Sequence, residues 1–199
     1  MKKYTVKKHY DRLISENDDP VNDPPELKAF MNGWDGEFFI EKMSLSPEKN
    51  VLEIGVGTGR LAVRICRLCK TFTGIDISPL TVRRAIRNLS EFHNAQVFCG
   101  NFLRYPFCEK FDLIYSSLTF FHIRRKLSAF KKVYRLLHEN GRFLLSVDKS
   151  GDRLIDCGVY AVPLYPDSPE KTEARLKKAG FSALEKFETE KSFIFLAQK

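Results

Sequence analysis

The stretch VLEIGVGTGR, residues 51–60, decides the fold of this chain. It begins as an apolar run typical of a buried strand and ends in a turn that contains Gly55, Gly57 and Gly59. Glycine adopts backbone angles that side chains forbid, and it lets a ligand approach the backbone closely. The stretch therefore predicts a strand, a tight turn and a helix, with a ligand pocket where the strand ends.

The spacing of these glycines separates two kinds of nucleotide site. A dinucleotide fingerprint, GxGxxG, would have its third glycine at position 60, but Arg60 stands there and the third glycine is Gly59. This spacing disfavours a pyrophosphate ligand, and with it an NAD-dependent oxidoreductase. A lone GxGxG also occurs in ordinary turns between strands and helices, so a second signal is needed.

Asp76 supplies the second signal, at the end of the apolar run TFTGIDI, residues 71–77. A carboxylate at this place can accept hydrogen bonds from both hydroxyls of a ribose. The alternative is that Asp76 only caps the helix that Ser78 and Pro79 begin. Together with the glycine turn, Asp76 predicts a ligand that contains a nucleoside.

The chain from Asn50 onward alternates apolar runs with helical patterns, which predicts an α/β fold with a doubly wound, Rossmann-like sheet. Seven strands are predicted, at 50–55, 71–77, 95–100, 110–117, 142–148, 183–190 and 192–199. Helices are predicted at about 60–70, 79–92, 127–137 and 169–179. The last two strands should form an antiparallel hairpin on a mostly parallel sheet, and residues 149–167 are expected to be irregular.

The first 49 residues have a different character. Helical patterns at 9–15 and 27–43 flank the proline-rich and acidic run DDPVNDPPE at 18–26. The segment is too short and too charged to bury a core of its own, yet it carries aromatic residues that need apolar cover: Tyr10, Phe30, Trp34, Phe38 and Phe39. We therefore expect residues 1–49 to form an N-terminal helical lid over the site in a main domain of residues 50–199.

These features resemble the class I S-adenosylmethionine-dependent methyltransferase family. The resemblance is carried by ExGxGxG at residues 53–59, by Asp76, by FDLIYSSLTFFHI at 111–123 and by the order of elements over 50–199. It implies S-adenosyl-L-methionine as cofactor, with the three glycines near its methionine part and Glu53 ordering the turn. It also implies that Asp76 holds the ribose and that Ile77 lies against the adenine.

The resemblance extends to further cofactor-binding residues, namely Tyr10, Thr58, Asn101, Phe102 and Ser117. Asn101 stands where the family commonly has an acid for the adenine amino group, and its amide oxygen can accept the same hydrogen bond. Tyr10 and Trp34 resemble the aromatic residues that the N-terminal helices of the family fold over the cofactor. Ordinary helix packing is the alternative for both.

The loop after the fourth strand, residues 116–123, should lie near the transferred methyl group. His122 is its one side chain that titrates near neutral pH, so it is the candidate catalytic base, with simple packing as the alternative. Tyr160 and Tyr165 are candidates to face the acceptor from the irregular segment.

Several subclasses are disfavoured. Asp23-Pro-Pro is followed by Glu26 rather than by the aromatic residue of [DNS]PP[YFW], and no pair of glutamates follows the fourth strand. Ser116 and Ser117 stand where a metal-dependent enzyme would have an acid, so no metal is expected. A small-molecule acceptor is the leading hypothesis. An RNA methyltransferase that binds phosphates through basic helices and a non-catalytic cofactor-binding protein remain the alternatives.

Composition adds broad limits. The 199 residues carry a net charge of +8, which is compatible with nucleic acid binding but also with solvated helix faces. No run is long and apolar enough for a membrane helix or a secretory signal, so a cytoplasmic protein without a membrane partner is expected. The five cysteines, with Cys66 and Cys69 in one CxxC, are expected to be reduced thiols. The sequence does not indicate an oligomeric state.

Overall fold

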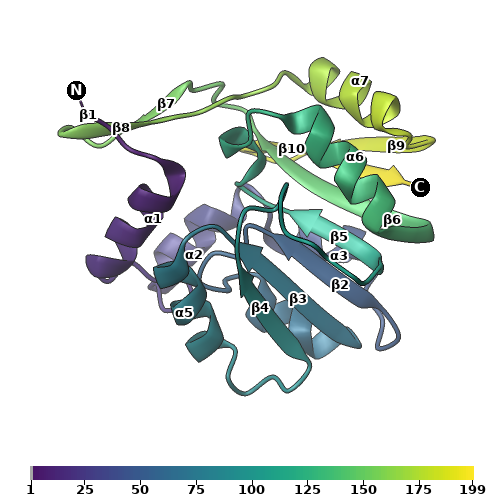
Figure 1. The fold of residues 1–199 in the computed structure, drawn as a ribbon, viewed down its shortest axis with the longest axis horizontal. Coiled ribbons are helices and arrows are strands. Elements are labelled where there is room, and N and C mark those ends of the chain that lie inside the picture. The colour runs from purple at the N-terminus through teal and green to yellow at the C-terminus, as the bar shows by residue number, and fades with distance from the viewer. Residues whose placement is uncertain (1) are drawn as a thin grey trace.

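A seven-stranded sheet forms the centre of the computed structural model, which describes residues 2–199 (Figure 1). Its strands are β2 (Asn50–Ile54), β3 (Thr71–Asp76), β4 (Ala95–Cys99), β5 (Phe111–Ser116), β6 (Leu137–Asp148), β9 (Ala183–Glu188) and β10 (Ser192–Gln198). They lie in the order β4-β3-β2-β5-β6-β10-β9, and β10 is antiparallel to both of its neighbours while the other pairs are parallel. The predicted Rossmann-like sheet with a C-terminal hairpin is confirmed.

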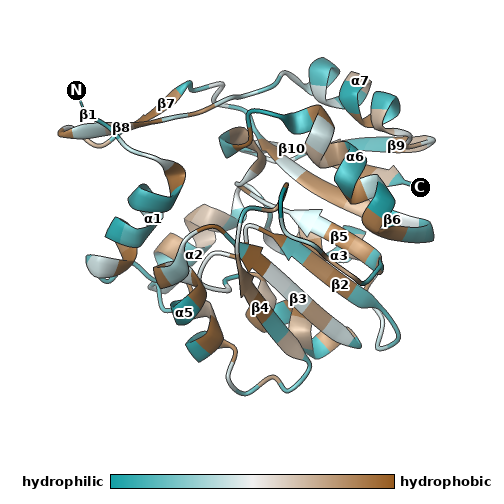
Figure 2. Cartoon of the chain, viewed as in Figure 1, coloured by the Kyte–Doolittle hydropathy of each residue, from teal (hydrophilic) through white to brown (hydrophobic). Residues whose placement is uncertain are grey.

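The two faces of the sheet bury alternate residues of the strands. Leu52 and Ile114 belong to the core beneath α6 (Lys126–Leu136) and α7 (Pro169–Ala179). Val51, Leu113 and Tyr115 belong to the core on the other face. In Figure 2 the central strands are largely hydrophobic and α7 is largely hydrophilic. This period of two is what parallel strands buried on both sides require.

Two helices begin as their sequences predict. The Ser78 hydroxyl accepts a hydrogen bond from the Thr81 N–H at the start of α5 (Pro79–Asn88), and Ser168 does the same for Lys171 in α7. Each serine satisfies an N–H that has no partner within the helix.

The second face of the sheet is covered by short helices. These are α3 (Gly36–Met43), α4 (Ala62–Ile65) and a 3₁₀ turn at Cys66–Leu68. A longer helix was expected at 60–70. It ends early because the Asn94 side chain donates to the carbonyl oxygens of Cys66 and Cys69, at 2.8 and 3.0 Å. Both thiols of this CxxC are free and buried.

The expectation of an irregular segment at 149–167 was wrong. The segment contains β7 (Leu154–Asp156) and β8 (Tyr160–Pro163), which form a small sheet with β1 (Lys2–Lys3) in the order β1-β8-β7. Its register pairs Lys2 with Tyr160, and the ring of Tyr160 stacks on Tyr4 at 4.0 Å between centroids. No local pattern indicates a strand whose partner lies at the other end of the chain.

The N-terminal segment forms α1 (Val6–Ser15), α2 (Pro25–Asn32) and α3. The helical pattern at 27–43 is interrupted because the Gly33 carbonyl accepts hydrogen bonds from Lys191 and Thr189 in the turn between β9 and β10. Phe39 is fully buried on the sheet as expected, but Phe30 and Phe38 are 54% and 38% exposed, so the expectation of apolar cover fails for both. Within residues 2–199, no helix has the length and apolar character needed to cross a membrane.

Candidate active site

A cavity of about 600 Å³ opens at the carboxyl ends of β2, β3 and β5. Eleven of the predicted site residues line it: Tyr10, Glu53, Gly55, Gly57, Thr58, Asp76, Ile77, Asn101, Phe102, Ser117 and His122. The predicted cofactor contact Gly59 does not. Parallel strands with helical crossovers place the ends of several loops at one edge of the sheet, so residues far apart in sequence meet there.

The glycine turn is shaped by contacts that a side chain would prevent. Gly55 has φ +80°, and a Cβ there would lie 2.0 Å from the hydroxyl of Thr119. Gly57 has φ +57°, but a Cβ there would meet no atom within 4 Å. Gly55 therefore permits close packing within the protein, whereas Gly57 leaves its space free in the lining of the cavity.

Asp76 accepts hydrogen bonds from the same turn. Its Oδ2 accepts from the Gly57 N–H at 3.2 Å and its Oδ1 from the Ser78 N–H at 2.9 Å. Burial raises the pKa of the Asp76 carboxyl, and these backbone N–H groups oppose that shift. The carboxylate is held in place and retains lone pairs for hydroxyl donors, since each oxygen has two acceptor sites.

Glu53 lies at the floor of the cavity and is 4% exposed. The Tyr115 hydroxyl donates a hydrogen bond to Glu53 Oε2 at 2.7 Å. Burial raises the pKa of the Glu53 carboxyl to about 8, against the opposing effects of Tyr115 and Arg60. Glu53 is therefore mostly protonated at neutral pH, as a buried carboxyl without a direct cationic partner should be.

The sequence did not predict the role of Asp35, whose side chain is fully buried. Arg60 donates to both carboxylate oxygens of Asp35, with Nη1 to Oδ1 at 3.0 Å, and Ser117 donates to Oδ2 at 2.5 Å. Asp35 thus joins the N-terminal segment to the glycine turn and to the end of β5. The three residues share no spacing or motif that could have indicated this contact.

Tyr10 and His122 meet across the cavity. The Tyr10 hydroxyl lies 3.0 Å from His122 Nε2, and His122 Nδ1 is buried with no hydrogen-bond partner within residues 2–199. Burial lowers the pKa of His122 to about 4 and raises the pKa of Tyr10. The imidazole is therefore neutral at physiological pH, and one of its nitrogens is free.

The remaining predicted residues divide in two groups. Asn101 lines the cavity but its Oδ1 also accepts a hydrogen bond from the Leu103 N–H at 2.9 Å, which closes its own turn. Trp34, Tyr160 and Tyr165 are not in the lining. The indole N–H of Trp34 instead donates to Asp148 at 3.0 Å.

Comparison with known proteins places these features in a family. A family model described as "Methyltransferase domain" matches residues 51–141, which include the glycine turn, Asp76 and His122. An uncharacterized methyltransferase of Staphylococcus carnosus is 32% identical over 132 residues. Over residues 51–141 this chain therefore matches a methyltransferase domain, as the resemblance to the class I S-adenosylmethionine-dependent methyltransferases implies.

The match to a methyltransferase domain agrees in fold with the solved structures. A [4+2]-cyclase, SpnF, superposes with a TM-score of 0.78 at 16% identity, over 100% of this chain and 98% of that one. A SAM-dependent methyltransferase from Aquifex aeolicus has a TM-score of 0.73 at 19% identity, over 94% and 97%. At these identities the structures show the shared fold alone. The S. carnosus match covers 61% of this chain and 62% of the relative.

Two acids outside the matched methyltransferase domain fasten the N-terminal segment over the cavity. Asp11 of α1 accepts hydrogen bonds from the Ser78 hydroxyl at 2.7 Å and from the Leu80 N–H at 3.3 Å. Asp19 pairs with Arg84 at 3.0 Å and accepts from Asn88 at 3.1 Å. Both acids bind α5, the helix that begins just after Asp76.

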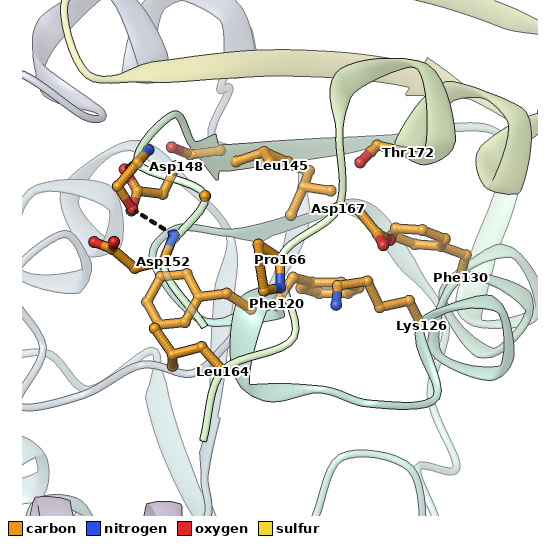
Figure 3. A pocket seen from close by; sticks show the side chains of 15 residues that line it. Phe120, Lys126, Phe130, Leu145, Asp148, Asp152, Leu164, Pro166, Asp167 and Thr172 are labelled. Atoms are coloured by element: carbon orange, nitrogen blue, oxygen red, sulfur yellow. Dashed lines mark hydrogen bonds between the residues drawn. The ribbon is translucent and has the colours of Figure 1, made fainter. Parts of the chain in front are cut away.

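A second, much smaller cavity lies beside the end of β6 (Figure 3). Its volume is about 20 Å³, which is room for about one water molecule. Lys126 lies in its wall, and its ammonium donates to the carbonyl oxygens of Ile123 and Tyr165. Among residues 2–199, no group of three or more His, Cys, Asp or Glu side chains is arranged to hold a metal ion.

Proposed function

We propose that this chain binds S-adenosyl-L-methionine in the large cavity and transfers a methyl group to a small-molecule acceptor. Two neighbouring features carry the proposal. A Cβ at Gly57 would meet open space, and the Gly57 N–H donates a hydrogen bond to Asp76 Oδ2, with 3.2 Å between nitrogen and oxygen. The open space fits close approach of a ligand to the backbone, and the carboxylate fits two ribose hydroxyls.

The cavity is large enough for a small-molecule ligand. Its volume of about 600 Å³ lies within the range of roughly 300 to 1,000 Å³ that small-ligand sites occupy. When bound, the cofactor supplies an activated methyl group. Glu53, Gly55, Gly57 and Thr58 would surround its methionine part, and Asp76, Ile77, Asn101 and Phe102 its nucleoside.

The acceptor would lie beside His122, next to the predicted cofactor contacts Tyr10 and Ser117. Methyl transfer to a nitrogen or oxygen releases a proton. Nδ1 of neutral His122 has no hydrogen-bond partner but is buried, so it would take this proton only from an acceptor atom that reaches it directly. A base with a pKa of about 4 is weak, so most of the acceleration is expected from positioning the two reactants.

The N-terminal segment, residues 1–49, is proposed to act as a lid. Val6, Tyr10, Pro20 and Met31 line the cavity, whereas α3 is packed into the core through Phe39 and Met43. The part that opens for exchange is therefore α1, α2 and the loop between them. Such a lid would exclude water from the reacting methyl group.

The proposal is tested by binding and then by turnover. Thermal unfolding and calorimetry with S-adenosylhomocysteine should show a raised melting temperature and saturable binding, and NAD should show neither. A response to NAD alone would contradict the cofactor assignment. Transfer of labelled methyl from the cofactor is then measured with a small-molecule extract and with total RNA. Label in RNA alone would favour an RNA methyltransferase, and binding without any transfer would favour a non-catalytic role.

A further inference from the structure

The rim of the cavity carries more positive charge than the cofactor site explains. Four arginines line the cavity, and one of them, Arg60, is neutralised by Asp35. The other three, Arg104, Arg124 and Arg125, are exposed and form no ion pair with any carboxylate of residues 2–199. Because arginine stays charged at every physiological pH, the rim holds three uncompensated cations.

These arginines come from two loops that the protein holds together. Lys132 of α6 donates to the carbonyl oxygens of Phe102 and Tyr105, at 2.6 and 2.5 Å, on either side of Arg104. The same helix begins directly after Arg124 and Arg125. The loop after β4 and the loop after β5 are thus fixed to one element.

The segment that carries Arg124 and Arg125 has a second support. Buried Lys126 donates to the Ile123 carbonyl at 3.2 Å and to the Tyr165 carbonyl. Both lysines therefore serve as structural ties, and the arginines are the cations left free to meet a ligand. Because the backbone that carries the arginines is already held, less of it has to be ordered when an anion binds.

The cavity's acidic residues do not neutralise this rim. Glu53 and Asp76 are the carboxyl groups in the lining, and both belong to the glycine-turn side. Glu53 is mostly uncharged at neutral pH, and Asp76 is hydrogen-bonded to Gly57 and Ser78. Between Asn101 and Lys126 the only acids are Glu109 and Asp112, and neither lines the cavity.

We infer that the methyl acceptor is a small anionic molecule, whose carboxylate or phosphate group is bound by Arg104, Arg124 and Arg125. The inference rests on the proposed function, since it assigns the acceptor side of the same cavity. Arginine's planar fork of N–H donors matches the oxygens of both anions, so the shared chemistry is an oxyanion beside the methylated atom.

The test uses the full chain saturated with S-adenosylhomocysteine, and inorganic phosphate and acetate as probes. Ligand-detected NMR should show binding of at least one of these two anions to the parent protein. The double variant Arg124→Gln, Arg125→Gln should bind the preferred anion at least about tenfold more weakly, because charge-assisted hydrogen bonds are lost. The matched control is Arg83→Gln, Arg87→Gln, which removes two exposed arginines of α5 outside the lining and should bind the anion like the parent.

The outcomes separate this inference from the proposed function. Failure of S-adenosylhomocysteine to bind the parent contradicts the proposed function itself. Normal S-adenosylhomocysteine binding with no anion binding, or with equal anion binding by parent and double variant, overturns the anionic acceptor alone. Preference for phosphate over acetate points to a phosphate ester, and the reverse to a carboxylic acid. Binding of a single-stranded RNA oligonucleotide much tighter than phosphate, lost in the double variant and steeply weakened by salt, would overturn the small-molecule assignment.

Discussion

Asp35 and Arg60 form a bidentate ion pair that joins the N-terminal segment to the glycine turn of the site. The Asp35 side chain is fully buried, and the Arg60 side chain is 17% exposed. The same aspartate accepts a hydrogen bond from the Ser117 hydroxyl. One carboxylate therefore links the N-terminal segment, the glycine turn and the end of β5.

Asp35→Asn should destabilise the protein by about 2 to 4 kcal/mol, since it leaves a largely buried guanidinium without its counter-charge. Urea unfolding measures the loss. Glu37→Gln is the matched control, because it breaks the exposed pair between Glu37 and Arg64 and should cost less than about 1 kcal/mol. Equal effects of the two substitutions would show that the buried pair contributes no more than an exposed one.

Asp76→Ala should weaken S-adenosylhomocysteine binding about tenfold or more, because charge-assisted hydrogen bonds contribute roughly 1.5 to 3 kcal/mol. Calorimetry measures the affinity, and circular dichroism checks that the variant folds. Glu190→Ala, which removes an exposed acid far from the lining, should leave the affinity unchanged. Unchanged binding by a folded Asp76→Ala would place the ribose elsewhere.

Glu53 should make stability depend on pH in a definite direction. Its folded pKa, about 8, is above the ordinary value of 4.5, so the native state keeps a proton that the unfolded chain loses. This contribution to stability is fully present below about pH 4.5 and is lost as the pH rises through 8. Glu53→Gln keeps an acceptor for Tyr115 and removes the titration. The stability of the parent relative to Glu53→Gln, from urea unfolding, should therefore fall between pH 5 and 8, and a constant difference would contradict the raised pKa.

His122→Asn should lower kcat by at most about a hundredfold, because a base with a pKa of about 4 contributes at the low end of general-base catalysis. Binding of S-adenosylhomocysteine should change little. Tyr10→Phe is the companion variant, since it removes the partner of Nε2 but leaves Nδ1 in place. A parent-like kcat in a folded His122→Asn would reduce His122 to a packing role.

The lid predicts a pattern of amide hydrogen exchange. Amides of α1 and α2 should gain protection when S-adenosylhomocysteine binds, more than those of β9 and β10, because segments that open locally respond to the ligand they cover. Amides of α3 should be protected already, since Phe39 and Met43 are buried in the core. Protection of α1 that does not change with ligand would contradict a moving lid.

The sheet and the cofactor side of the cavity were predictable because local signals specify them. A glycine turn, an acid at the end of the next strand and serine-proline helix starts each act over a few residues. These signals predicted seven strands, of which the last two form an antiparallel hairpin. They also predicted that residues as distant as Glu53 and His122 line one cavity.

The parts that sequence reasoning missed depend on partners far along the chain. The carboxylates of Asp11, Asp19 and Asp35 look like surface charges in the sequence, and only the folded arrangement brings them to α5 and Arg60. The small sheet was missed for the same reason, since β1 and β8 are each too short to be recognised alone.

The parallel pairing of Lys2 with Tyr160 also has a consequence for how the chain is made. Lys2 and Lys3 are synthesised long before β8, so they gain their strand partner only after about 160 further residues have followed. Until then α1 has its contacts with α5 but not those with β8. The central strands from β2 to β5 can pair before that point, so the order of synthesis leaves the cavity without its complete cover until late, when the strand that ends at Pro163 has emerged.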